Sequence, residues 1–391
     1  MLRRISLSLI IMLIIACVST SGITASADTA AANEKVGIMQ DVEKMTLQPV
    51  LPVPETTEKA EPVKPDAAIP ESTGMADKAV EPAKSQAVNE DVISISFAGD
   101  CTLGTDTSFS YDNSFTDRFV KEDSDYSYFF RNVKPIFEAD DLTLVNLETT
   151  LTNAKKPAVK QFRFKGDPSY VNILKAGAVE AVNIANNHIH DYLAEGFEDT
   201  VKALDGGGIL YSGWDKTAYQ TIRGVTVAMI GYTIWDTGVK AKVLESIEAA
   251  AEKADIIIVS FHWGEERVNY ASKYQRELAH FCIDHGADAV IGHHPHVIQG
   301  IESYKERYIV YSLGNFCFGG NRNPTDKDCI IFQDKFFIKQ GKLDRTEAEV
   351  IPCSISSVGY INNYQPAILY GEEKERVLQR VKKYSEPYNQ P

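Results

Sequence analysis

The sequence predicts an α/β fold for the part of the chain that begins near residue 91. All 38 aromatic residues lie at or after Phe97, and a long stretch without aromatic side chains is poorly suited to building a core. From residue 91 onward, apolar runs rich in β-branched residues alternate with amphipathic segments, which is the pattern of strands and helices in α/β proteins. The apolar runs contain few polar positions, as expected of strands that are buried on both faces.

The expected elements follow one another in order along this body. Continuous apolar runs predict strands at residues 92–100, 142–148, 179–188, 255–266, 288–296, 297–303 and 307–316. Two further strands over 219–233 are expected to turn at Arg223 and Gly224. Amphipathic spacing predicts helices at residues 126–141, 168–178, 192–208, 240–253, 272–287 and 370–391. Pro168 and Gly177 fit the two ends of their helix, whereas Pro135 disfavours a continuous helix over 126–141.

The formal net charge of the chain is −14, which bears on its partners. Binding to nucleic acid depends on a basic surface, so nucleic acid is not expected as a partner. An anionic polymer would also be repelled by the protein as a whole. Such a substrate would therefore need a locally basic site.

The first 27 residues have the features of a secretory signal sequence. Arg3 and Arg4 precede an apolar run, and Ala25 and Ala27 form a cleavage pattern of small residues. Two alternatives remain open, namely an uncleaved membrane anchor and lipidation at Cys17, since "IIAC" loosely resembles a lipobox. All three place the body of the protein outside the cytoplasmic membrane.

Residues 28–90 are predicted to be a disordered linker rich in Pro, Glu, Lys and Ala. Seven prolines fall in this segment, and such compositions stay extended and solvated, as a tether would. The functional domain is expected over 91–340, followed by a C-terminal extension over 341–391 that packs on the domain and ends in a frayed tail. No C-x-x-C spacing occurs, so a structural zinc cluster is not expected, while a disulfide between Cys317 and Cys329 remains open.

Polar residues that can bind metal ions recur where the predicted strands end. In an open α/β sheet the carboxyl ends of the strands are where sites assemble, so these side chains are expected to share one site. Taken singly, each has a simpler explanation, because a strand-end aspartate is usually a turn former and a histidine such as His262 is usually packed in the core. The residues at these ends are Asp100, Asn146, Glu148, Asn186, Asn187, His188, Asp191, His262, Glu265, His293, His294, His296 and Asn315.

The segment "IGHHPHVIQG" contains three of the eight histidines of the chain. Pro295 disfavours the α conformation for His294, which predicts an extended backbone there. In an extended chain residues i and i+2 face the same way, so His294 and His296 are expected to point together as metal ligands. His293 would then point the other way, either to support the ligands from behind or to fill the core.

Carboxylates, amide oxygens and neutral imidazoles suit Mn, Fe, Zn or Mg ions, and a bridging carboxylate such as Glu148 suits a site with two of them. One or two divalent ions are therefore expected. His188 lies beside the expected ligands, where it could act as a general acid, and Asp191 is its candidate catalytic partner. Arg163 and Lys165 follow the segment "VNLETTLT" and could bind a phosphate or carboxylate locally, although a solvated strand face explains them as well.

The ordered motifs "FAGDCTLG", "VNLETTLT", "NIANNHIHD", "SFHWGEE", "IGHHPHVIQG" and "YSLGNF" resemble those of the bacterial capsule synthesis protein CapA family, over about residues 92–320. That family is associated with the synthesis and export of poly-γ-glutamate. It in turn is similar to the calcineurin-like metallophosphoesterases, which implies a multi-layer α/β sandwich with mixed sheets and a two-metal site. The resemblance carries metal-ligand roles to Asp100, Glu148, Asn187, His262, His294 and His296.

Two departures from the phosphoesterase pattern affect the expected metal count. Thr102 stands where a histidine is usual in the first motif, and the bridging residue is Glu148 rather than an aspartate. One metal subsite is therefore short of a ligand, so a single ion is as well supported as two.

The resemblance implies a secreted or membrane-tethered protein that acts in the synthesis, export or anchoring of an anionic polymer such as poly-γ-glutamate, beside its membrane synthase. If the site is catalytic, the metal would activate water against a phosphoester or an amide-type bond. Two alternatives remain, namely a stand-alone secreted phosphoesterase and a non-catalytic accessory protein that binds the polymer or the synthase.

Overall fold

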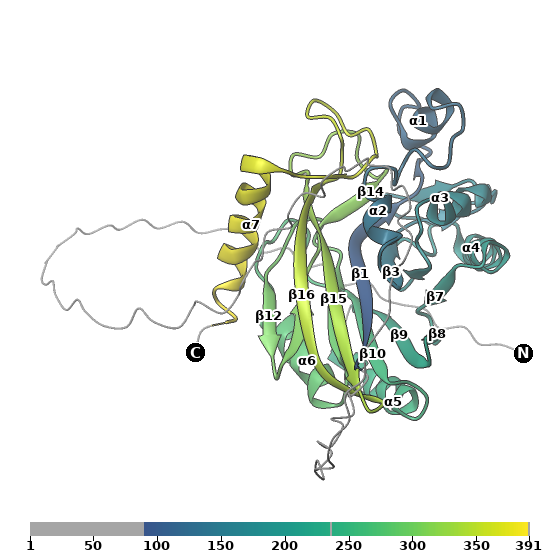
Figure 1. Ribbon diagram of the computed structural model, residues 1–391. Coiled ribbons are helices and arrows are strands. Elements are labelled where there is room, and N and C mark those ends of the chain that lie inside the picture. The colour runs from purple at the N-terminus through teal and green to yellow at the C-terminus, as the bar shows by residue number, and fades with distance from the viewer. Residues whose placement is uncertain (1–89, 235–236, 390–391) are drawn as a thin grey trace, which may run out of the picture. The chain divides into compact units, whose positions relative to one another are not determined.

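The computed structural model describes residues 90–234 and 237–389 of the protein (Figure 1). The predicted signal sequence and nearly all of the predicted linker lie outside the described residues. Among the described residues no helix is long and apolar enough to cross a membrane.

The larger of the two main sheets has eight strands in the order β17-β16-β15-β1-β3-β6-β7, with β14 pairing with the end of β1. It is mixed, because β1 is parallel to β3 and β14 but antiparallel to β15. Its strands are β1 (Glu90–Thr102), β3 (Leu142–Leu147), β6 (Ala181–Asn183), β7 (Leu210–Ser212), β14 (Asn315–Phe318), β15 (Asp328–Lys339), β16 (Lys342–Ser354) and β17 (Ala367–Ile368).

The second main sheet has six strands in the order β12-β13-β11-β10-β9-β8, and it is also mixed. Its strands are β8 (Ala218–Ile222), β9 (Val225–Thr233), β10 (Ile256–His262), β11 (Ala289–His293), β12 (Ile301–Tyr304) and β13 (Arg307–Val310). A small third sheet is formed by β2 (Thr105–Asp106), β5 (Phe164–Gly166) and β4 (Thr150–Leu151).

Three buried clusters of apolar side chains show how the layers stack. One cluster joins the outer face of the larger sheet to helices, a second lies between the two main sheets, and a third joins the second sheet to its own helices. The result is a four-layer arrangement, which confirms the predicted α/β sandwich with mixed sheets. The helices are α1 (Phe115–Lys121), α2 (Lys134–Phe137), α3 (Val171–Ala176), α4 (Leu193–Gly207), α5 (Lys240–Ala251), α6 (Lys273–Asp284) and α7 (Gly371–Ser385), with short 3-10 turns at η1 (Pro168–Tyr170) and η2 (Thr237–Val239).

The turn between β8 and β9 lies where the sequence predicts it. Arg223 and Gly224 both have positive φ angles, of 48° and 87°. A two-residue hairpin turn with both central residues in the left-handed region matches the twist of the flanking strands, and glycine adopts this conformation without strain.

The predicted helix over 126–141 is wrong for most of its length. Only α2 is an α-helix in this segment, and Pro135 lies in its first turn. Proline has no N–H group and clashes with the carbonyl four residues earlier, so it begins this helix and cannot continue one from residue 126. The preceding residues form turns, and their aromatic side chains Phe129 and Phe130 fill the core beneath the larger sheet.

The C-terminal part of the chain continues the larger sheet. Residue 340 falls in the turn between β15 and β16, and these two strands pair from Asp328 with Ser354 to Lys339 with Lys342. Helix α7 lies beside β12 and β16 (Figure 1). Its side chains Val377 and Val381 join the core between the two main sheets. The five described cysteines are all buried and free, so Cys317 and Cys329 form no disulfide.

Candidate metal centre

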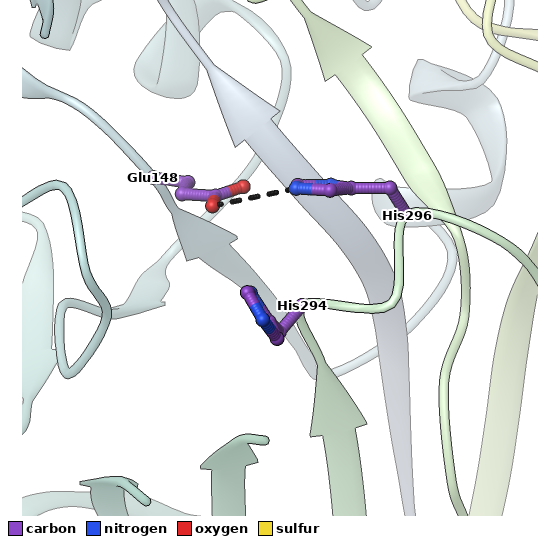
Figure 2. A group of neighbouring side chains, drawn as sticks. All are labelled: Glu148, His294 and His296. Atoms are coloured by element: carbon purple, nitrogen blue, oxygen red, sulfur yellow. Dashed lines mark ion pairs between the residues drawn. The ribbon is translucent and has the colours of Figure 1, made fainter. Parts of the chain in front are cut away.

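The carboxyl ends of strands from both main sheets bring the predicted site residues together. Asp100 lies near the end of β1, Glu148 directly follows β3, and His262 is the last residue of β10. His294 and His296 follow β11 (Figure 2). Asn315 differs from the expectation, because it begins β14 instead of ending a strand. It still lies at this edge, since β14 pairs in parallel with the end of β1.

Glu148 is at the centre of the site. Its side chain is fully buried, and neither carboxylate oxygen has a hydrogen-bond partner among the described residues. The Nε2 atoms of His262, His296 and His188 lie 3.5, 3.8 and 3.9 Å from its Oε1 atom. Burial raises the pKa of Glu148 well above its usual range. A buried carboxylate without hydrogen bonds is costly, so the fold retains a polar group here that needs a cationic partner.

His294 and His296 lie together, but the predicted backbone geometry is wrong. Their φ angles are 96° and 57°, so the segment around Pro295 turns through the left-handed region instead of extending. Pro295 does exclude the α conformation for the residue before it, yet a turn satisfies that restriction as well as a strand does. Ligand atoms of Glu148, His294 and His296 all lie within 4.8 Å of one another, and Figure 2 shows both rings near the carboxylate.

A network of amides holds Asp100 and His262 in place. Asn146 Nδ2 donates a hydrogen bond of 2.8 Å to Asp100 Oδ1 and lies 3.3 Å from His262 Nδ1. The side-chain oxygen of Asn146 in turn accepts hydrogen bonds from Asn183 and Asn186, at 2.9 and 3.3 Å. This network orients the His262 ring so that its Nε2 atom faces Glu148. Supporting contacts of this kind fix the orientation of metal ligands.

His188 forms a second buried cluster beside Glu148. Its Nδ1 atom lies 2.6 Å from Asp191 Oδ2, and Asp191 Oδ1 accepts a hydrogen bond of 2.6 Å from Lys160 Nζ. Lys160 Nζ also donates to the backbone oxygen of Asn187 at 2.7 Å. Because Asp191 engages Nδ1, the Nε2 atom of His188 is the one that faces Glu148. Burial lowers the pKa of His188, although the contact with Asp191 opposes that shift.

Most of the imidazoles are held neutral, which is the state that binds metal ions. Burial lowers the pKa of His293 and of His294 to about 4, and it lowers the pKa of His262 well below the usual range. His296 is the exception, because the carboxylates of Glu148 and Asp100 overcome the effect of burial and raise its pKa to about 10. The charged form of His296 therefore pairs with the charged form of Asp100.

Asp100 is stabilised in its charged form. Burial alone would raise the pKa of Asp100, but the hydrogen bond and charge of His296 lower it below its usual range. His296 Nδ1 lies 3.2 Å from Asp100 Oδ2 and 2.9 Å from Asn315 Oδ1, and the backbone N–H of His294 donates to Asp100 Oδ2 at 3.3 Å.

The remaining predicted residues occupy different positions around the centre. His293 is buried with Nδ1 3.6 Å from Asp100 Oδ1, and neither ring nitrogen has a hydrogen-bond partner among the described residues. The side-chain oxygen of Asn187 is buried and equally unpartnered in the described structure. Asn186 donates to the Leu147 carbonyl and accepts a hydrogen bond from the His188 N–H, so it supports the ligands without offering an oxygen to a metal. Thr102 is buried, and its hydroxyl has no hydrogen-bond partner in the described part of the chain.

The predicted anion-binding pair and Glu265 lie apart from the ligands. Arg163 donates its backbone N–H to Asp106, with its guanidinium 3.9 Å from the same carboxylate. Lys165 Nζ donates to the Ala154 carbonyl. Glu265 is exposed, whereas the negative charge of its neighbour Glu266 acts on Glu148, His294 and His296.

Three residues near the site were missed from the sequence. Lys160 contacts Asp191, and it could have been noticed as one of several lysines in a segment without acidic residues. The Phe164 ring packs on His188 with centroids 4.4 Å apart. Asn183 joins the amide network as the last residue of β6, a position in an apolar run that gave no separate signal.

The donor set fits a divalent cation. An unpartnered buried carboxylate, neutral imidazole nitrogens and a buried amide oxygen converge from several strands, and this mixture suits Mn, Fe, Zn or Mg. Because imidazole binds metal only when neutral, a divalent cation here would take over the role of the proton on His296.

The fold and this centre first define a class of protein, namely an α/β sandwich with a candidate divalent-metal site at the ends of its strands. The comparison with known families then identifies the particular group. Residues 94–320 match the model of the family described as "Bacterial capsule synthesis protein PGA_cap", and the chain belongs to this family.

Similar proteins include the "PGA biosynthesis protein CapA" of Bacillus subtilis, which is 34% identical over 69% of this chain and 74% of its own length. The "Capsule biosynthesis protein CapA" of Bacillus anthracis is 33% identical over 52% of this chain and 57% of its own length. Among solved structures, a hypothetical protein from Thermus thermophilus aligns over 66% of this chain and 99% of its own, with 15% identity and a TM-score of 0.42. The 5'-nucleotidase of Candida albicans covers 75% of this chain and 58% of its own, with 14% identity and a TM-score of 0.37.

Proposed function

We propose that this protein acts outside the cytoplasmic membrane in the synthesis of a poly-γ-glutamate capsule, through a metal-bearing, phosphoesterase-like site. Membership of the capsule synthesis family supports the role, and the printed names of the two Bacillus relatives connect it with capsule and PGA biosynthesis. The predicted signal sequence and linker support the location. A role in export or anchoring, next to a membrane synthase, is part of this proposal.

The observation that carries the proposal is Glu148, a buried and unpartnered carboxylate that faces His262 and His296 from the second main sheet and His188 from the larger one. Glu148, His262, His294 and Asn187 would hold the cation, and Asp100 with His296 would complete a second position. When bound, a divalent cation at such a site activates a water molecule and polarises a phosphoryl or carbonyl oxygen.

The chain's own residues supply the proton transfer. With its Nδ1 proton donated in a hydrogen bond to Asp191, neutral His188 has an unprotonated Nε2 atom that can accept a proton at the edge of the ligand cluster and then pass it to a leaving oxygen. Lys160 neutralises Asp191 and holds the backbone of Asn187, which fixes both in place. Asn146 and its amide partners position the His262 ring and Asp100 and take no part in proton transfer.

Metal analysis of the purified full-length protein, with His294→Ala beside it, tests the site. We expect Mn, Fe or Zn to copurify with the unmodified protein and to be reduced in His294→Ala. His285→Ala is the matched control, because that histidine is exposed at the end of α6 and contacts only its own helix in the described structure. Metal at background level in the unmodified protein would overturn the proposed site.

The capsule role is tested separately in a poly-γ-glutamate-producing cell that lacks its own protein of this family. We expect the unmodified chain to restore polymer yield and His294→Ala to fail. If the purified protein hydrolyses a generic phosphodiester but never affects polymer yield, the stand-alone phosphoesterase is the better description.

A further inference from the structure

Residues 153–165, here called the basic loop, carry a charge opposite to that of the protein as a whole. The loop contains Lys155, Lys156, Lys160, Arg163 and Lys165 and no acidic residue, in a chain with a net charge of −14. Such a local reversal of charge is what an anionic ligand would need to approach an acidic protein.

Not all of these cations are already paired with carboxylates. Lys160 is held by Asp191, and the Arg163 guanidinium lies near Asp106. Lys155 and Lys156 are exposed, and neither makes a hydrogen bond or ion pair with any residue in 90–234 or 237–389.

Lys165 is the third cation without a carboxylate partner. Its Nζ atom donates to the Ala154 carbonyl and lies 4.8 Å from the centre of the Tyr192 ring. Burial, and then the charge of Lys155, lower the pKa of Lys165.

A cleft lined by both polar and apolar groups lies beside Lys165. It has a volume of about 360 Å³, and Lys165 is its only lysine or arginine. Its wall is rich in hydroxyl groups, from Thr105, Thr107, Thr116, Thr152, Ser169 and Tyr170. One carboxylate lines it, Asp167, which accepts a hydrogen bond from the Ser169 N–H at the start of η1. The Thr152 hydroxyl already donates to Asp199, but the Lys165 ammonium and other hydroxyls can donate to carboxylate oxygens, so the cleft can accept an anionic group.

The basic loop connects this cleft with the candidate metal centre. Asn153 and Lys165, at the two ends of the loop, line the cleft, and Lys160 in the middle of the loop contacts Asp191 and the Asn187 carbonyl. On β5, Phe164 packs on His188 while its neighbour Lys165 lines the cleft, as alternating residues of a strand do. A chain molecule lying along the loop would therefore reach both places.

We infer that the cleft and the basic loop bind carboxylates of an anionic polymer whose neighbouring segment occupies the metal centre. The inference rests on the proposed function, and it assigns the polymer as poly-γ-glutamate. Lysines suit the carboxylates of a flexible chain, because each ammonium group acts as a point charge on a flexible stem. Densely charged nucleic acid would be repelled by the acidic body, since its binding requires many phosphate contacts.

Binding of a fluorescent poly-γ-glutamate oligomer to the full-length protein, followed by anisotropy at physiological salt, tests this. We expect Lys155→Ala/Lys156→Ala to weaken binding by roughly three- to tenfold, as for the loss of two exposed ionic contacts. Lys165→Met should weaken it further while keeping the stem over Tyr192. The control is Lys382→Ala/Lys383→Ala, an equally exposed adjacent pair on α7 with the same change in charge.

The outcomes separate this inference from the proposed function. The subsite is overturned if the Lys155/Lys156 and Lys382/Lys383 double variants lose equal binding affinity for the oligomer, or if neither loses any. This holds even when metal content and polymer yield are normal. Absence of oligomer binding to the unmodified protein overturns it too, and leaves the metal analysis standing. If the same lysines matter more for polyphosphate or single-stranded DNA than for poly-γ-glutamate, the assigned ligand is wrong.

Discussion

Two buried carboxylates in this protein look alike in isolation and differ in their surroundings. Glu148 and Asp334 are both fully buried, and the oxygens of both lack hydrogen-bond partners among the described residues. Burial raises the pKa of each well above the usual range. Glu148, however, faces three imidazoles within 3.9 Å. Asp334 lies in β15 beside Ile95 of β1, a residue of the core between the two main sheets.

The difference shows that burial without partners does not by itself mark a metal site. The charges of Arg307 and Asp288 act on Asp334, with opposite effects on its pKa, but neither residue forms an ion pair with it in the described structure. No histidine surrounds it among the groups that affect its pKa. At Glu148, donors from several strands converge on the same carboxylate, and convergence is what metal binding requires.

The largest expected effect separates the two carboxylates directly. Glu148→Gln removes the central ligand, so metal affinity should fall by more than roughly 100-fold, the upper range for losing even an outer-shell contact. Asp334→Asn makes the same chemical change in the other environment and should leave metal content unchanged. Equilibrium dialysis against a competing chelator measures both. Loss of metal from both variants would contradict the distinction drawn here.

Asp191 extends the comparison to a buried carboxylate that is fully satisfied. It accepts hydrogen bonds from Lys160 and the Phe164 N–H and contacts His188, so Asp191→Ala would leave three polar groups without their partner. We expect the free energy of unfolding to fall by about 3–5 kcal/mol, as when one member of a buried pair is removed. Denaturant unfolding measures the change. A loss below about 1 kcal/mol, the size expected for an exposed pair, would show that this cluster is hydrated.

Replacing Asp334 should raise the free energy of unfolding instead of lowering it. With a raised pKa, Asp334 stays protonated in the folded state at pH values where the unfolded state has lost its proton. Its contribution to stability is therefore greatest below the unfolded pKa of about 3.9 and falls as pH rises toward the folded pKa.

We expect Asp334→Asn to raise the free energy of unfolding at pH 7 by about 1–3 kcal/mol relative to pH 4, within the range of single substitutions. Unfolding curves at the two pH values measure this difference. Glu349→Gln is the control, because Glu349 is an exposed carboxylate on the adjacent strand. If both variants change the pH profile equally, Asp334 is not the group responsible.

The smallest effect concerns Asp328, a buried carboxylate whose two arginine partners are partly exposed. The Arg376 guanidinium donates hydrogen bonds of 2.5 and 2.7 Å to the two oxygens of Asp328, and this pair attaches α7 to the start of β15. The Arg376 side chain is 45% exposed and Arg380 still pairs with Asp328 after its loss, so Arg376→Ala should cost only about 0.5–1 kcal/mol. The loss should shrink in high salt, which thermal unfolding with and without added salt would show. Lys374→Ala, at an exposed position on the same helix, is the control.

Much of the fold could be predicted because its signals are local. Apolar runs and amphipathic spacing lie within single elements, so the alternation of strands and helices and the turn at Arg223 and Gly224 were read from short windows. The predicted helix over 126–141 failed where a local signal, Pro135, was weighed less than the apolar spacing. Strand β16 was missed because it is mostly half-exposed and lacks a continuous apolar run, whereas β15 was missed although it carries the apolar run Cys329–Phe332.

The residues of the candidate site were also predictable only in part. Strand-end chemistry was predictable, since an α/β sheet collects the ends of its parallel strands at one edge. Lys160 and Phe164 were not, because their roles depend on where the loop after β4 folds back onto His188.

By itself, the sequence determined the α/β class, the order of most elements and the kinds of donor at each strand end, because those properties depend on residues close together in the chain. The tertiary structure decided which donors meet. The hydrogen bond from His294 to Asp100 joins residues 194 positions apart, and the left-handed turn at His294 and His296 follows from that packing. It also decided that Glu148 meets imidazoles while Asp334 does not, since contacts between distant strands are absent from any local pattern.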